Sequence, residues 1–158
     1  MEKSKKAVRA VPEGFHTVTP YLVVDNATKF MEFIQKAFNG KITYVMKQPD
    51  DQKVMHATVQ IGDSTIMLSD AMEGHPAQTA ILYLYVNNAD ELFDKATQAK
   101  ATVVQKMEDQ FYGDHVGAVK DEWGNVWWIG KHVEDVEEKE LERRAKIVQK
   151  ERKEKAHA

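Results

Sequence analysis

Alternating side chains in residues 55–61 place a histidine among polar neighbours on a predicted strand. His56, Thr58 and Gln60 alternate with apolar residues, the first of which is Met55. Successive side chains of a strand point to opposite faces, so the apolar set should face the core and the polar set should face away from it. A histidine on the outer face can bind or protonate a ligand near neutral pH. The alternative is a histidine that is hydrogen-bonded within the sheet.

Aromatic side chains share this predicted outer face. In residues 80–86, Tyr83 and Tyr85 alternate with Leu82 and Leu84, and the leucines should face the core. The full predicted ligand-binding set is Tyr21, His56, Thr58, Gln60, Tyr83, Tyr85, Phe111, Tyr112, His115 and Trp128. Aromatic walls with few polar groups are typical of small-molecule pockets. Tyrosine and tryptophan are also favoured where two subunits meet, so a pocket and a subunit interface both fit this pattern.

Residues 108–114 form a predicted loop that mixes acidic, aromatic and glycine residues. Beside a pocket, Phe111 and Tyr112 could act as a lid or a rim. The alternative is a structural turn in which Asp114 accepts hydrogen bonds from backbone amides. Four histidines outside these segments are predicted to be structural or exposed to solvent: His16, His75, His132 and His157.

A near repeat organises the elements that carry these residues. The string YLVVDNA at residues 21–27 returns as YLYVNNA at residues 83–89, an offset of 62, which indicates a unit used twice. The first copy is predicted to have strands at 17–24, 41–47, 54–61 and 64–69 and a helix at 27–38, capped by Asn26. The second copy is predicted to have strands at 80–86, 101–106, 116–120 and 125–130 and a helix at 89–100. Each copy therefore reads βαβββ.

Composition limits the possible function classes. The 158 residues are 42% hydrophobic and 30% charged, which fits one domain or two small units. A net charge of −3 without a basic stripe argues against nucleic acid, and no apolar run is long enough to span a membrane. Residues 1–12 are a basic leader without the apolar segment of a signal peptide. Cysteine is absent, which excludes thiolate chemistry and fits a cytoplasmic protein.

Several strings of the sequence resemble one family. Residues 12–24, 55–64, 108–114 and 132–136 are similar to segments of the PhnB-like branch of the glyoxalase/bleomycin-resistance/dihydroxybiphenyl-dioxygenase superfamily, whose members are also called vicinal oxygen chelate proteins. The resemblance implies an α+β fold of paired βαβββ modules, with curved mixed sheets around a cleft, and a homodimer. The domain would span residues 13–133, with modules at about 17–70 and 79–131. The charged residues 134–158 are predicted to form a solvated tail helix.

The same resemblance bears on metal binding. Many enzymes of this superfamily bind a divalent metal through four positions, which by resemblance fall at Thr19, Ile81, Trp128 and within residues 66–68. None of these residues is His, Glu or Asp, whereas an open metal site needs about three such ligands. The resemblance therefore implies that this chain holds neither a metal nor another cofactor. PhnB-like relatives usually carry arginine where this chain has His115, which weakens an anion-binding role.

These observations predict a protein that binds a small organic molecule in an aromatic, metal-free cleft. The first alternative is a metal-dependent lyase or isomerase with displaced ligands, drawn from His56, His115, Asp114 and His16, of which three would have to converge. The second alternative is a non-catalytic interaction module, in which the aromatic face is a dimer interface and the tail engages a partner.

Overall fold

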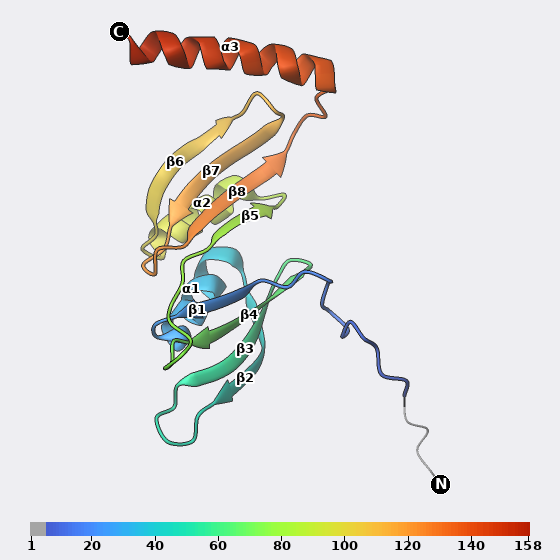
Figure 1. Cartoon of the computed structure of the whole chain (residues 1–158), viewed down its shortest axis with the longest axis vertical. Coiled ribbons are helices and arrows are strands. Elements are labelled where there is room, and N and C mark those ends of the chain that lie inside the picture. Colours follow the sequence, from blue (N-terminus) through green and yellow to red (C-terminus); the bar gives the residue numbers. More distant parts are fainter. Residues whose placement is uncertain (1–5) are drawn as a thin grey trace. The chain divides into compact units, whose positions relative to one another are not determined.

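The computed structural model describes residues 6–158 and divides the chain into two compact units, Met1–Thr79 and Ala80–Ala158. Each unit carries one helix on a four-stranded mixed sheet (Figure 1), and the second unit continues into a further helix. The α+β class and the repeated βαβββ order predicted from the sequence are confirmed. No helix among the described residues has the length and the apolar composition that a membrane span requires.

The first unit builds its core between α1 and the sheet. Its elements are β1 (Tyr21–Val24), α1 (Ala27–Phe38), β2 (Lys41–Lys47), β3 (Val54–Ile61) and β4 (Ser64–Asp70). The strand order is β1-β4-β3-β2, with β1 parallel to β4 and the other neighbours antiparallel. Phe30, Ile34 and Ala37 recur at helical spacing and are fully buried, so one face of α1 packs on the sheet.

In the first unit, the Asp70 carboxylate at the end of β4 binds the first residues of α1 and β3. Asp70 Oδ1 accepts a hydrogen bond from the Ala27 amide at 3.0 Å, and its Oδ2 accepts one from the Val54 amide at 2.7 Å. Asn26 has a left-handed backbone, and its side chain accepts from the Lys29 amide at 3.2 Å. The predicted helix cap at Asn26 is therefore confirmed.

The second unit repeats this architecture. Its elements are β5 (Ile81–Tyr85), α2 (Ala89–Gln98), β6 (Thr102–Asp109), β7 (Asp114–Lys120), β8 (Val126–His132) and α3 (Glu138–Ala156). The strand order is β5-β8-β7-β6, with β5 parallel to β8 and the other neighbours antiparallel. Trp127 lies fully buried in the core, and its Nε1 donates to Asp121 Oδ2 at 2.9 Å.

Three local predictions need correction. β1 begins at Tyr21 rather than at residue 17, since Pro20 directly precedes it and carries no amide hydrogen for a ladder. Met55 is 42% exposed because β3 bulges there: Val54 pairs with Lys47 and His56 with Met46, so Val54 takes the buried position. The predicted loop at 108–114 shrinks to four residues between β6 and β7.

Candidate functional site

The outer face of β5 presents two tyrosines that share one acceptor. Tyr83 and Tyr85 are two residues apart, so both point away from the core, and they are 39% and 64% exposed. Their ring centroids lie 4.9 Å apart. Both hydroxyls donate to Asp114 Oδ2, at 2.7 Å from Tyr83 and 2.8 Å from Tyr85. A single carboxylate therefore restrains both tyrosine rings, whose planes are tilted by 41°.

The second oxygen of Asp114 continues the network to a histidine. Asp114 and His132 are register partners on β7 and β8, and His132 Nδ1 lies 2.8 Å from Asp114 Oδ1. His132 Nε2 lies 2.7 Å from Oδ1 of Asp135, which follows β8. The imidazole is thus hydrogen-bonded at both nitrogens to carboxylates, an arrangement that favours its doubly protonated, charged form.

Burial and hydrogen bonding set the charges of this network. Burial acts to raise the pKa of Asp114, but hydrogen bonds from His132 and the two tyrosines outweigh it and hold that pKa below its usual range. The carboxylates of Asp114 and then Asp135 raise the pKa of His132. Burial and the hydrogen bond to Asp114 raise the pKa of Tyr83, and the same hydrogen bond raises that of Tyr85. Both phenols therefore stay protonated at neutral pH.

Trp128 and Gly130 on β8 complete the aromatic face. The Trp128 ring stacks on Tyr83 with centroids 6.4 Å apart and planes 9° from parallel. Gly130 lies beneath the tyrosines, and a Cβ built there would approach the Tyr83 hydroxyl oxygen to 3.0 Å. A side chain at position 130 would therefore displace the ring. We call Tyr83, Tyr85 and Trp128, together with the Asp114 carboxylate that accepts from both tyrosines, the tyrosine face.

In the first unit, the predicted site residues form a smaller group. The His56 ring lies 5.7 Å from that of Tyr21 and 6.5 Å from that of Tyr44. Thr58 is buried, and its hydroxyl lies 2.7 Å from the Thr43 hydroxyl. Gln60 is half-buried on the same strand. The structure thus brings the rings of Tyr21 and His56 together. The Thr58 hydroxyl, in contrast, is hydrogen-bonded to Thr43 within the sheet.

The remaining predicted residues lie around the turn between β6 and β7. The Phe111 and Tyr112 rings meet edge to face with centroids 5.3 Å apart. His115 Nδ1 lies 2.7 Å from Asp109 Oδ1, and its Nε2 lies 3.0 Å from Asp90 Oδ1. Both nitrogens of His115 are therefore committed to carboxylates, and the residue ties α2 to the β6–β7 hairpin.

Two members of the network lie outside the ligand-binding set predicted from the sequence. Asp114 was expected either as a cap for backbone amides or as a displaced metal ligand, whereas its carboxylate binds side chains from β5 and β8. His132 is exposed, as predicted, but it is ion-paired on both sides. The string HVED at residues 132–135 contains His132 and Asp135, one of its two carboxylate partners, whereas Asp114 lies outside that string.

Comparison with known proteins decides the family. The family model of the Glyoxalase/Bleomycin resistance protein/Dioxygenase superfamily matches residues 14–129. The chain belongs to this superfamily. The match covers β1 to most of β8 and leaves α3 outside, so the glyoxalase-like part comprises both βαβββ copies.

Relatives of this glyoxalase-superfamily chain include proteins without an assigned activity. An uncharacterised Mycobacterium bovis protein, Mb0911c, is 35% identical over 136 residues, which cover 79% of this chain and 89% of the relative. TioX from Micromonospora sp. ML1 has a similar fold, with a TM-score of 0.60 at 20% identity over 77% of this chain and all of TioX. A PhnB protein from Bacillus cereus superposes with a TM-score of 0.57 at 17% identity, covering 73% of this chain and 99% of that protein.

Many superfamily enzymes bind a metal at positions that, by resemblance, correspond to Thr19, Ile81 and Trp128. In this chain these residues make other contacts or are exposed. Thr19 Oγ1 donates to the His16 carbonyl at 3.1 Å. Ile81 is 75% exposed on β5, and Trp128 stacks on Tyr83. Within residues 6–158, no group of three or more His, Asp or Glu side chains is arranged to hold a metal ion. Metal-free binding remains a prediction.

Proposed function

We propose that this glyoxalase-superfamily protein binds a small, largely planar organic molecule on the tyrosine face. The observation that carries the proposal is the shared hydrogen bonding of Tyr83 and Tyr85 to the buried carboxylate of Asp114. It fixes two exposed rings beside Trp128 before any ligand arrives, which reduces the ordering cost of binding. Flat molecules gain most from such a surface, because aromatic pairs favour stacked and edge-to-face contacts.

The direction of these hydrogen bonds further restricts the class of ligand that the tyrosine face can bind. Each phenol has one proton, and both protons already point to Asp114. The two phenolic oxygens therefore offer only lone pairs to a ligand. We expect a bound molecule to carry an N–H or O–H donor at the edge that meets these oxygens. Aromatic faces and a nearby carboxylate also tolerate a positively charged ligand.

Thermal unfolding against a panel of planar compounds, with and without a donor group, tests this proposal. A compound at 100 times its dissociation constant should stabilise the fold by about 2.7 kcal/mol. Trp128→Ala should remove the stabilisation, and Tyr85→Phe should weaken it only for compounds that carry a donor. Tyr44→Ala removes an exposed ring from the other sheet and serves as the control. Equal shifts in all variants would place binding elsewhere and refute the proposal.

The same face also supports a homodimer. Ile81 is 75% exposed two residues before Tyr83, and exposed aliphatic and aromatic side chains of this kind are often covered by a partner. We include a second copy of the chain in the proposal, and sedimentation of wild type and Ile81→Glu tests it. A wild-type monomer at micromolar concentration would refute this part and leave ligand binding to be tested separately. A cytoplasmic location stays a prediction.

A further inference from the structure

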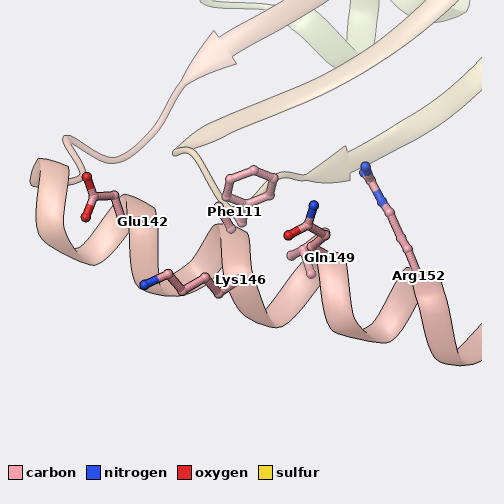
Figure 2. A pocket seen from close by; sticks show the side chains of 7 residues that line it. Phe111, Glu142, Lys146, Gln149 and Arg152 are labelled. Carbon is pink, nitrogen blue, oxygen red and sulfur yellow. The ribbon is translucent and has the colours of Figure 1, made fainter.

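A groove lies between α3 and the turn that carries Phe111. Its volume is about 430 Å³, within the range of small-molecule sites. Phe111, Ala145 and Val148 supply an apolar lining, and Figure 2 shows the Phe111 ring over the helix. The family model ends at residue 129, so the helical wall of this groove lies outside the superfamily's matched region.

The lining residues of α3 follow helical spacing. Glu142, Lys146 and Gln149 are separated by four and three residues, and Ala145 and Arg152 lie on the adjoining row. Such positions share one face of a helix. Figure 2 shows Gln149 and Arg152 directed to the side of the helix on which the Phe111 ring lies. Polar and cationic groups therefore border an apolar centre.

The cations of this groove differ from the other arginines of the helix. Arg143 pairs with Glu140, and Arg144 pairs with Glu134 and Glu140 and donates to the Phe111 carbonyl at 3.1 Å. Arg144 thereby fixes the helix beside Phe111. In contrast, no carboxylate of residues 6–158 lies within ion-pair distance of Lys146 or Arg152. Two cations against one carboxylate, Glu142, leave the groove with an excess positive charge.

We propose that this groove binds a small amphipathic carboxylate. Its aromatic or aliphatic body would lie against Phe111, Ala145 and Val148, and its carboxylate would pair with Arg152, which Figure 2 shows on the Phe111 side of the helix. Guanidinium and ammonium groups form charge-assisted hydrogen bonds with carboxylates, and these bonds are stronger than those between neutral groups. The site is separate from the tyrosine face in its residues and in its charge preference.

Titration of the ¹⁵N-labelled full chain with 2-naphthoate tests the proposal by NMR. We expect saturable shifts of the Ala145, Val148 and Gln149 amides. Arg152→Ala should weaken binding about tenfold, in line with the loss of a charge-assisted hydrogen bond. Phe111→Ala should weaken it as well. Lys150→Ala removes the same charge from the same helix outside the groove, so it should leave the affinity within about twofold.

Other outcomes overturn the carboxylate proposal. Equal binding of the neutral analogue 2-naphthylmethanol would show that the cations do not recognise the ligand. An affinity lowered by Trp128→Ala but not by Arg152→Ala would assign the naphthoate to the tyrosine face. No amide shifts at millimolar naphthoate, together with a dimer broken by Val148→Glu, would show that a second copy covers the groove. Unchanged circular dichroism of Arg152→Ala guards against misfolding as the cause.

Discussion

Asp114 and His132 meet across a register pair of β7 and β8, with 2.8 Å between Oδ1 and Nδ1. The other carboxylate oxygen is held by Tyr83 and Tyr85 on β5. Three strands of the second sheet therefore depend on one side chain that is only 3% exposed. Side chains that share a hydrogen-bond network respond together when a common member is removed.

Asp114→Ala should lower the free energy of unfolding by about 3 kcal/mol, because it leaves two phenols and an imidazolium without their acceptor. Urea denaturation measures the change. Asp135 holds the far side of His132 but is fully exposed, so Asp135→Ala should cost much less. Equal losses in the two variants would contradict the central position of Asp114.

The two ionised members of the network make opposite contributions to the pH dependence of stability. The pKa of His132 is raised from 6.5, so its contribution is complete below 6.5 and is lost as the pH rises through the folded-state value. The pKa of Asp114 is lowered from 3.8, so its contribution is complete above 3.8 and is lost as the pH falls through the folded-state value. The network should therefore be most stabilising between these limits.

Unfolding free energies measured by urea denaturation from pH 5 to pH 9 test the histidine part of this prediction. Stability should fall above pH 6.5 in wild type, and His132→Asn should flatten the fall. Asp90 and Asp109 raise the pKa of His115, so the contribution of His115 to stability is also lost as the pH rises. A double variant that replaces both His132 and His115 should therefore flatten the curve further. A His132→Asn curve parallel to that of wild type would be inconsistent with this account.

Gly113 allows the segment after β8 to pass close to the β6–β7 turn. Its φ is +98°, its carbonyl accepts from the Val133 and Glu134 amides, and a Cβ would collide with the Glu134 carbonyl. Gly74 has a φ of +81° with open space around it. Gly74→Ala should therefore cost about 1 kcal/mol for the left-handed backbone alone. Gly113→Ala should cost about 3 kcal/mol or more in the same urea experiment. Similar costs at both positions would mean that the close approach contributes nothing.

Arg144 should control the attachment of the first turns of α3. Its guanidinium contacts Glu134 and the Phe111 carbonyl, whereas Arg143 pairs only with Glu140 in the described structure. We expect Arg144→Ala to speed amide hydrogen exchange across residues 138–148. Arg143→Ala, which keeps the contacts to the turn, should change exchange there much less. The reverse ranking would indicate that the helix is held by other groups.

Sequence periodicity was a good guide to the elements because it reports which side of each element is buried. The 62-residue repeat and the alternation of Leu82 and Leu84 with tyrosines gave the βαβββ order and the outer face of β5. Periodicity did not predict the bulge at Met55, because a bulge depends on how β3 pairs with β2. The tyrosine rings were predicted, but their anchor was missed.

Asp114 was missed because its role depends on pairings between distant segments. Its carboxylate meets side chains 31 and 29 residues earlier and 18 residues later. Within its own segment, a glycine followed by aspartate is typical of a turn, and the local prediction was a cap for backbone amides. Only the register of β7 on β8, with β8 also pairing with β5, brings these groups together.

The parallel pairings of β1 with β4 and of β5 with β8 set when each unit can complete its sheet during ribosomal synthesis. In each unit, the first strand finds its neighbour only after the fourth strand has emerged. All four strands of the first unit precede residue 71, so that unit can close while the second is still being translated. A growing chain thus exposes the unpaired strands of one unit at a time, which limits the edges open to mispairing with other nascent chains.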